Sequence, residues 1–273
     1  MKKIISITLA LLMVLTSVLA FSSCAQKTDW ENIQEKGKFI CGVTYYEPMN
    51  YFDTDGTLIG FDTELAQAVA KELGLEVEFY EIEWNNKYSE LASGAIDCIW
   101  NGFTSNSKDD DGVERKDKVD FTYAYLDNKQ CVVVASDRVG EFTSASSLTG
   151  KTAAAEEGSA GASYAASAGA TVVPKSSQMD TFTELATGAV DCIVVDMLLA
   201  DKIVGQGDFA ELAKTSIEIE PEVYSIGCRK GSDFDEKINE ALIKLLNDGT
   251  IEALAAKYGV RVTDSLMAKK TAE

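Results

Sequence analysis

The stretch ELASGAIDCIW (Glu90–Trp100) returns almost unchanged as ELATGAVDCIVVD (Glu184–Asp196). In each copy a helical pattern ends at a glycine, Gly94 or Gly188, and a short apolar run of strand-like residues follows. A helix followed by a buried strand is the building unit of α/β proteins. The repeat therefore predicts one structural unit, a helix and a central strand, at equivalent places in two α/β lobes.

The rest of the chain also alternates between strand and helix patterns. Strands are predicted at residues 38–44, 75–82, 95–100, 130–136, 151–156, 170–174, 189–195 and 222–230. Helices are predicted at residues 62–74, 85–94, 160–169, 177–188, 196–204, 233–249 and 250–259, with Asp62 as the cap of the first. This repeated strand–helix–strand order indicates parallel sheets with helices on both faces.

Residues 1–23 are organised like a secretory signal. Lys2 and Lys3 make a basic start, an apolar run follows, and small residues end the segment. No second apolar run in the sequence is long enough to span a bilayer. We therefore expect an exported protein whose signal peptide is removed.

A cysteine directly follows this segment. Phe21-Ser22-Ser23-Cys24 resembles a bacterial lipobox, in which the cysteine is acylated and becomes the first mature residue, although Phe21 stands where leucine is usual. An ordinary cleaved signal followed by a chance cysteine is the alternative. The lipobox interpretation predicts a lipid at Cys24, a linker at residues 24–28, and a protein anchored to the outer face of the cytoplasmic membrane, or periplasmic.

The composition limits the classes of partner. The chain of 273 residues carries 44 acidic and 25 basic side chains, a net charge of −19 that becomes −21 once Lys2 and Lys3 are removed. Such a surface repels nucleic acid and anionic lipid headgroups, so we expect no nucleic-acid partner and no membrane contact beyond the lipid anchor. The sequence contains no histidine, which is the most common general base and metal ligand. We predict no cofactor and no metal site.

Five cysteines follow Cys24, and each lies in or beside an apolar run. None forms the Cys-x-x-Cys or zinc-ligand spacing that indicates redox or metal chemistry. We expect buried thiols that pack as small apolar side chains. A disulfide between Cys41 and Cys98 remains an alternative if their strands are neighbours.

Six segments of the chain, in order, resemble the family 3 extracellular solute-binding proteins, which are the substrate-binding proteins of polar amino-acid ABC transporters. They include ERKDKVDFTYAY and LTGKTAAAEEGSA, and they occupy residues 55–84, 91–104, 114–125, 148–160, 185–196 and 224–259. The resemblance implies an α/β fold, a two-lobed periplasmic-binding-protein clamshell of type II, with a mainly parallel sheet flanked by helices in each lobe. It further implies a lobe 1 at residues 29–127 and 225–265, a lobe 2 at 132–221, a two-stranded hinge near 128–132 and 222–226, and a C-terminal tail at 266–273.

The same resemblance implies that an amino acid binds in the cleft between the lobes. A buried zwitterion needs a partner for each charge, because an unpaired buried charge is costly. The resemblance puts Asp196 on the α-ammonium group, with Asn101, Gly102, Phe103 and Thr104 beside it to supply backbone oxygens and a hydroxyl. Both copies of the repeat thus end at the site, where the carboxyl ends of strands present ligand-binding groups. The alternative is that Asp196 only caps the following helix.

The ligand's carboxylate has two candidate partners. The resemblance favours Arg115, which keeps the family's distance to Val119-Asp120-Phe121, although the segment before it is longer than in the family. That lengthening leaves Lys108 as a rival, and a solvated charge run as a third interpretation. Ser159 and Ala160 match a turn at a helix N-terminus that also holds the carboxylate, and such termini bind anions.

Tyr46 and Trp84 match the family's two aromatic walls of the side-chain pocket, with core aromatics as the alternative. Val43 stands where binders of basic amino acids carry an aspartate, which favours a neutral polar amino acid or cystine, although Glu47 could restore a negative charge. The resemblance therefore implies a non-enzymatic substrate-binding component of an ABC importer, whose partners are a free amino acid and the transmembrane subunits of a permease. An enzyme on the same fold, similar to cyclohexadienyl dehydratase, is the alternative.

Overall fold

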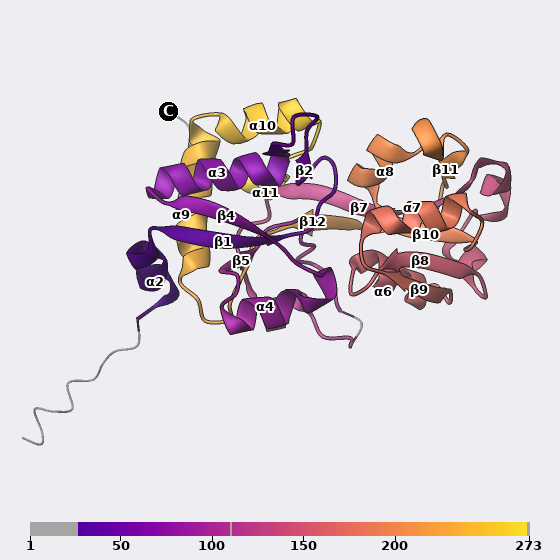
Figure 1. Ribbon diagram of the computed structural model, residues 1–273, viewed down its shortest axis with the longest axis horizontal. Helices are drawn as coiled ribbons and strands as arrows, with labels where there is room; N and C mark the ends of the chain where they lie inside the picture. The colour runs from indigo at the N-terminus through magenta and orange to yellow at the C-terminus, as the bar shows by residue number, and fades with distance from the viewer. Residues whose placement is uncertain (1–26, 110, 272–273) are drawn as a thin grey trace, which may run out of the picture.

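The structure is a computed structural model that describes residues 27–109 and 111–271 (Figure 1). The predicted signal peptide at residues 1–23 and the predicted lipid site at Cys24 lie outside the described residues, as do residues 25–26 and 272–273. None of the helices in the described ranges is long and apolar enough to cross a membrane.

Helices and strands alternate along the described chain as predicted. The helices are α2 (Asp29–Lys36), α3 (Phe61–Leu73), α4 (Lys87–Ser93), α5 (Arg115–Lys118), α6 (Ala160–Ser167), α7 (Gln178–Ala186), α8 (Met197–Ile203), α9 (Phe234–Asn247), α10 (Thr250–Tyr258) and α11 (Asp264–Met267). The strands are β1 (Lys38–Val43), β2 (Tyr51–Phe52), β3 (Leu58–Ile59), β4 (Glu76–Glu81), β5 (Cys98–Ile99), β6 (Asp120–Phe121), β7 (Leu126–Ala135), β8 (Thr152–Glu156), β9 (Thr171–Lys175), β10 (Cys192–Asp196), β11 (Leu212–Lys214), β12 (Pro221–Tyr224) and β13 (Gly227–Cys228). Short 3-10 helices are η1 (Trp84–Asn86), η2 (Ser136–Glu141), η3 (Ala145–Leu148) and η4 (Gly207–Phe209).

The first sheet has the strand order β4-β1-β5-β13-β6. Strand β1 runs parallel to β4 and β5, whereas β13 runs antiparallel to β5 and β6. Helices α3, α9 and α10 pack against one another on one side of this sheet, and α4 lies on the other (Figure 1). The first copy of the repeated stretch forms α4 and β5.

The second sheet has the order β11-β7-β10-β8-β9, and β12 also pairs with β7. Strands β8, β9 and β10 are parallel neighbours, whereas β7 runs antiparallel to β10 and β11. Helices α6 and α7 contact these parallel strands. The second copy of the repeat forms α7 and β10, so the predicted helix–strand unit does recur in two sheets.

Both sheets are mixed, although the family resemblance implied mainly parallel ones. Along each sheet, two neighbouring pairs of strands are parallel and two are antiparallel. The strands that reverse direction are β13 in the first sheet and β7 in the second, and each follows a strand of the other sheet in the chain. Each of these two strands enters its sheet directly from the other sheet, so it runs antiparallel to the strands that follow helices.

Strands β7 and β12 join the two sheets. Residues 126–129 of β7 pair with β12, and residues 130–133 continue into the second sheet by pairing with β10. The prediction of a single strand at residues 222–230 is therefore wrong. Strand β12 ends at Tyr224, and β13 starts at Gly227 in the first sheet. The chain leaves one hydrogen-bonded ladder and joins another within these few residues.

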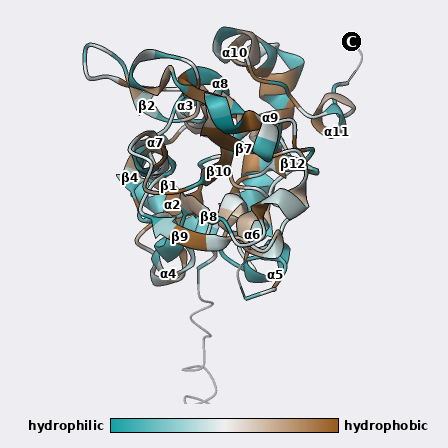
Figure 2. Cartoon of the chain, turned by 90° about the vertical axis from the view of Figure 1, so that its right-hand side faces the viewer, coloured by the Kyte–Doolittle hydropathy of each residue, from teal (hydrophilic) through white to brown (hydrophobic). Residues whose placement is uncertain are grey.

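The central strands carry the core. Every residue of β10 is buried, and one large cluster of buried apolar side chains includes both Phe39 of β1 and Ile193 of β10. In Figure 2 the hydrophobic colour is strong on β7, and hydrophilic colour covers much of the outer helices α3 and α10. The buried strands that the apolar runs predicted are therefore confirmed.

Asp62 does not cap α3 as predicted. The helix begins at Phe61 with Gly60 in the capping position, and no side chain makes a capping bond. Asp62 is only 1% exposed, and its carboxylate accepts hydrogen bonds from the Gly102 N–H (2.8 Å) and the Tyr125 hydroxyl (2.8 Å). Burial raises the pKa of Asp62 to about 7. The residue therefore anchors the loop that follows β5, because a buried carboxyl group needs hydrogen-bond donors.

All five cysteines of the described ranges are buried and free, as the sequence led us to expect. Cys41 of β1 and Cys98 of β5 are register partners whose Sγ atoms lie 3.5 Å apart. Cys228 of β13 is the register partner of Cys98 on its other side. The three thiols thus form a row across the first sheet, without the disulfide that the sequence left as an alternative.

We expect these thiols to be unreactive in the folded protein. Burial raises the pKa of Cys131 and of Cys192 to about 12, and it raises the pKa of Cys98 and Cys228 well above the usual range. The thiolate is the reactive form, so a Cys24→Ser variant should bind less than about one equivalent of a chromogenic thiol reagent before denaturation. After denaturation it should bind five. Rapid modification of several thiols in the native state would contradict this account of the core.

Candidate ligand-binding site

Both copies of the repeated stretch end at one cavity. Its volume is about 20 Å³, so the walls lie close together. Its lining comes from both sheets and consists of Trp84, Asn101, Gly102, Thr104, Arg115, Gln130, Glu156, Ser159, Ala160, Gln178 and Asp196. The carboxyl ends of β5, β8 and β10 lead into it, which is where α/β sheets present ligand-binding groups.

Asp196 is the last residue of β10 and is 6% exposed. Its Oδ1 accepts hydrogen bonds from the side-chain amides of Asn128 (3.1 Å) and Gln130 (2.5 Å), and its Oδ2 accepts one from Gln178 (2.6 Å). The residue occupies the capping position of α8 but makes no capping bond. Burial raises the pKa of Asp196. Neutral amides thus orient this carboxylate without matching its charge, which leaves it suited to a cation in the cavity.

Asn101, Gly102 and Thr104 line the cavity from the first sheet. The Thr104 hydroxyl donates to the Glu222 carboxylate (3.1 Å), so its own oxygen lone pairs stay free to accept a hydrogen bond. Two hydrogen bonds to Thr44 hold the Asn101 side chain. Its Oδ1 accepts one from the Thr44 hydroxyl (2.6 Å), and its Nδ2 donates one to the Thr44 backbone carbonyl (2.7 Å). These bonds fix the loop, so its polar groups face the cavity in a defined arrangement.

Phe103 differs from the expectation, because it does not line the cavity. Phe103 is fully buried in the core, whereas its neighbours Gly102 and Thr104 line the cavity. Its carbonyl accepts a hydrogen bond from the Ser225 N–H (3.0 Å) and is therefore engaged. Its ring packs edge-on against Trp84, with ring centroids 5.3 Å apart. Phe103 thus supports the cavity wall from behind.

Of the two expected aromatic walls, only Trp84 reaches the cavity. Trp84 starts η1 and is 5% exposed. Tyr46 lies behind Gly102 instead, where its hydroxyl oxygen is 2.0 Å from the point that a Cβ on residue 102 would occupy. Tyr46 therefore fills the space that the glycine leaves, and the loop separates it from the cavity.

Arg115 lines the cavity at the start of α5 and is 1% exposed. Its Nε donates to Asp109 (2.9 Å), and its two terminal nitrogens donate to the carbonyls of Thr104 (3.2 Å) and Gly158 (3.2 Å). Lys108 does not line this cavity: its side chain is 60% exposed and forms an ion pair with a glutamate of the same loop (3.4 Å). The structure thus brings Arg115 to the site, and the lengthened loop supplies the aspartate that orients it.

Ser159 and Ala160 line the cavity where α6 begins. Ser159 caps this helix, because its hydroxyl accepts a hydrogen bond from the Ala162 N–H (3.0 Å). The preceding carbonyl, on Gly158, accepts a hydrogen bond from the buried Lys87 ammonium (3.2 Å) of the first sheet's α4. The N-terminus of α6 therefore faces the cavity beside groups of the first sheet, and its dipole favours an anion there.

Three polar residues of the cavity lining were not expected from the sequence, namely Gln130, Glu156 and Gln178, and neither was Glu222, which contacts the lining through Gln130 and Thr104. The two glutamines carry no local signal, because their hydrogen bonds to Asp196 depend on how distant elements meet. Glu156, in contrast, did carry a local signal in the sequence. It is the polar end of an otherwise buried apolar strand, TAAAE, and such strand ends are where parallel sheets hold ligands.

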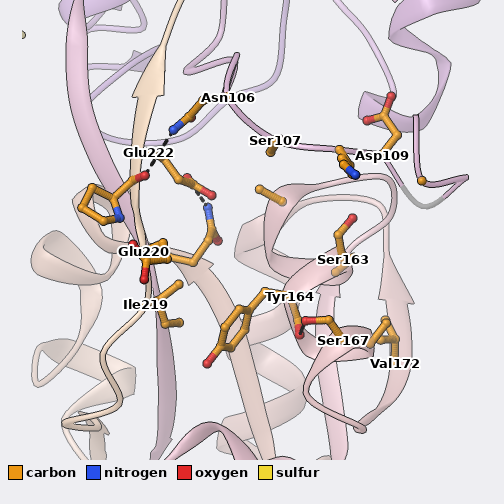
Figure 3. A pocket seen from close by; sticks show the side chains of 17 residues that line it. Asn106, Ser107, Asp109, Ser163, Tyr164, Ser167, Val172, Ile219, Glu220 and Glu222 are labelled. Carbon is orange, nitrogen blue, oxygen red and sulfur yellow. Dashed lines mark hydrogen bonds between the residues drawn. The ribbon is translucent and has the colours of Figure 1, made fainter. Parts of the chain in front are cut away.

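A second, larger cavity of about 600 Å³ adjoins the first (Figure 3). Gln130 and Ala160 line both cavities, and the hydrogen bond from Gln130 to Glu222 (3.0 Å) lies at this shared wall. Figure 3 shows Asn106 approaching from the loop before α5 and Tyr164 from α6. In neither described range do three or more metal-ligating side chains gather into a group that could hold an ion.

The model of one protein family, the bacterial extracellular solute-binding proteins, family 3, matches residues 39–261. The chain belongs to this family. The resemblance seen in the sequence is thereby confirmed over nearly the whole described chain.

Individual relatives of this family 3 solute-binding protein cover almost its full length. The L-cystine-binding protein TcyA of Bacillus subtilis (strain 168) is 29% identical over 270 residues, which are 92% of this chain and 96% of that protein. The arginine-binding extracellular protein ArtP of the same organism is 26% identical over 256 residues, again 92% and 96% of the two chains. Both relatives are non-enzymatic binding proteins.

Solved structures match the fold. An ABC uptake transporter substrate-binding protein from Streptococcus pneumoniae with bound histidine superposes with a TM-score of 0.75 at 29% identity, covering 86% of this chain and 97% of that one. A mutant of ArgBP from T. maritima gives a TM-score of 0.76 at 28% identity, with 85% and 99% covered. The two mixed sheets flanked by helices are therefore the fold of periplasmic amino-acid-binding proteins.

Proposed function

We propose that this protein is the amino-acid-binding component of an ABC uptake transporter, which binds a free polar amino acid between the walls of its small cavity as they move apart and delivers it to the permease. The observation that carries the proposal is the pairing of opposite charges in one cavity. Arg115 from α5 and Asp196 from β10 both line it, and both are buried.

The hydrogen bonds of the cavity support a zwitterionic ligand. Arg115 uses three of its N–H groups on protein oxygens, so two of the five that a guanidinium carries remain for a carboxylate beside the α6 N-terminus. Asp196 and the lone pairs of Thr104 are acceptors for an α-ammonium group. Each charge of the ligand would meet an opposite buried charge, which is the condition for burying a zwitterion without a large penalty.

The proposed mechanism is closure of two lobes on the ligand. Lobe 1 comprises residues 29–127 and 225–265, lobe 2 comprises 132–221, and β7 and β12 form the hinge. In the closed arrangement, Lys87 and Arg115 of lobe 1 both donate to the Gly158 carbonyl of lobe 2. A ligand that contacts both lobes binds the closed state better than the open one and therefore shifts the population toward it.

The protein is proposed to work outside the cytoplasm. Removal of residues 1–23 and acylation of Cys24 would hold it on the outer face of the cytoplasmic membrane, where it can meet the transmembrane subunits of the permease. Metabolic labelling with a fatty-acid analogue tests the anchor, because a Cys24→Ala variant should lose the label and leave the membrane fraction.

Calorimetric titration of the Cys24→Ser protein against the twenty amino acids and cystine tests the proposed function. At least one ligand should bind with a Kd below about 100 μM, which corresponds to a standard free energy near −5.5 kcal/mol. Failure of every one of these ligands to bind would refute the proposed function.

Arg115→Lys should weaken binding of that ligand by about 10- to 100-fold, because a lysine cannot offer a carboxylate two parallel hydrogen bonds. Arg138→Lys is the matched control, since Arg138 lies outside the cavity and pairs with Glu141 and Asp191 instead. The control should bind as tightly as the wild type in the same titration. Equal affinities of the two variants would exclude Arg115 from the carboxylate site.

A further inference from the structure

The cavity contains one more carboxylate than a zwitterion needs. Asp196 and Glu156 both line it, whereas Arg115 is the only basic residue among the described residues of its lining. A zwitterion that pairs with Asp196 and Arg115 would leave Glu156 without a partner. A buried carboxylate in that position must either take up a proton or meet a second cation.

Glu156 is placed to contact the ligand. It ends β8, it is 4% exposed, and β8 is the parallel neighbour of β10, whose end carries Asp196. Both carboxylates therefore line the cavity at the carboxyl end of the second sheet. Asp196 is held by three amide donors, whereas no donor of the described ranges forms a hydrogen bond to the Glu156 carboxylate. Glu156 thus has free acceptor capacity directed at the cavity.

The charged groups around Glu156 do not supply the missing partner. It is faced by Asp196 from β10, Lys87 from α4, Glu83 just before η1 and Arg115 from α5. Their charges lower the pKa of Glu156 in part, but neither cation forms a hydrogen bond with its carboxylate, since the Lys87 ammonium and the Arg115 guanidinium donate to backbone carbonyls. Burial, reinforced by Asp196, raises the pKa of Glu156 to about 8.

We infer that Glu156 is a specificity-determining residue that pairs with a cationic side chain of the ligand, so that the site takes a basic amino acid such as L-arginine or L-lysine. This inference rests on the proposed amino-acid site. A basic amino acid balances the cavity, because its two cationic groups meet two carboxylates while its own carboxylate meets Arg115. Val43 favoured a neutral ligand, but that pattern concerns a position in β1 and takes no account of a carboxylate supplied by the other sheet.

The test compares L-arginine with L-citrulline, which has the same length but a neutral side chain, by calorimetry on three proteins. At pH 8 or above the wild type should bind L-arginine about 100-fold more tightly, since breaking one buried charge pair costs at least that factor. Glu156→Gln should lose this preference by weakening L-arginine about 100-fold and L-citrulline less than about threefold. Glu157→Gln is the matched control, because Glu157 is the exposed neighbour of Glu156 and should change neither affinity.

The pH dependence provides a second test, measured on the wild type and on Glu156→Gln. Below pH 8 Glu156 is largely protonated, and it must release its proton before it can pair with a cation. The ratio of the L-arginine to the L-citrulline affinity should therefore rise by up to about tenfold per pH unit from pH 6 to 8 and then level off. Titration of Asp196 affects both ligands alike, because both carry an α-ammonium group, and it cancels in the ratio. Burial lowers the pKa of Lys87 to about 7, so Lys87 loses its charge in the same range and also raises the ratio; the part of the rise that is absent in Glu156→Gln belongs to Glu156.

Each contrary result has a distinct meaning. If Glu156→Gln weakens both ligands equally, Glu156 serves the α-ammonium group or the fold, and the inference is wrong. If a neutral amino acid or cystine binds more tightly than L-arginine, or the ratio is flat with pH, the inference is wrong while the amino-acid site stands. If no amino acid binds at all, the inference and the proposed function both fail.

Discussion

Asp196→Asn should reduce the affinity for the amino-acid ligand by at least about 100-fold, because the α-ammonium group would then be buried without an opposite charge. The unliganded variant should remain folded. Burial already raises the pKa of Asp196, so removal of its charge relieves an unfavourable contribution to stability rather than creating one. The three amides around it can turn to suit the new side chain. Titration calorimetry measures the loss, and thermal unfolding without ligand should show a Tm close to the wild-type value.

Asp191→Asn is the matched control for this variant. Asp191 immediately precedes β10, at the opposite end of the strand from Asp196, where it accepts hydrogen bonds from Thr152 (2.9 Å) and Arg138 (3.1 Å). Its substitution should lower the Tm by a few degrees at most and leave the affinity unchanged. An Asp196→Asn protein that binds within threefold of the wild type would remove Asp196 from the site.

Gly102→Ala should destabilise the protein by about 3 kcal/mol, the sum of a left-handed backbone penalty and of overpacking. Residue 102 has φ +54°, and a Cβ there would lie 2.0 Å from the Tyr46 hydroxyl oxygen and 2.9 Å from a ring carbon of Tyr224. Both rings are buried in the core, so neither can move aside without loss. The affinity should fall as well, because the displaced loop carries Asn101 and Thr104.

Gly94→Ala separates the backbone penalty from the effect of overpacking. Gly94 ends α4 with a similar positive φ of +77°, but a Cβ on residue 94 would meet no atom within 4 Å other than those of its chain neighbours. This control should cost only the backbone penalty of about 1–2 kcal/mol and leave the affinity unchanged. Denaturant unfolding followed by circular dichroism measures both variants. Equal losses for Gly94→Ala and Gly102→Ala would mean that Tyr46 does not occupy the space behind the loop.

Local patterns in the sequence predicted most of the fold. Each helix–strand unit of the repeat is set by apolar spacing and a glycine stop, and both units formed as α4 with β5 and α7 with β10. The mixed sheets were not predictable in this way. Strand direction at β7 and β13 depends on the chain crossing twice between sheets, which no local pattern records.

The location of a cavity residue was predicted where the family resemblance assigned it a role, as at Asp196, which does line the cavity. It was not predicted where the direction of a side chain depends on distant contacts. Asp62 has the pattern of a helix cap, yet its carboxylate is taken by Gly102, 40 positions away in the chain. Tyr46 fills the space behind the same glycine. Glu156 has the sequence signal of a polar residue at the end of a buried apolar strand, but the presence of Asp196 in the same cavity depends on how β8 and β10 pack together.

The most direct test of the central claim is a crystal structure of the protein with the amino acid that binds most tightly among the twenty and cystine. The account predicts that the ligand's α-nitrogen lies about 3 Å from the Asp196 carboxylate and that its carboxylate accepts two hydrogen bonds from Arg115. A ligand that sits in the larger neighbouring cavity, or that leaves either Asp196 or Arg115 without contact, would contradict it.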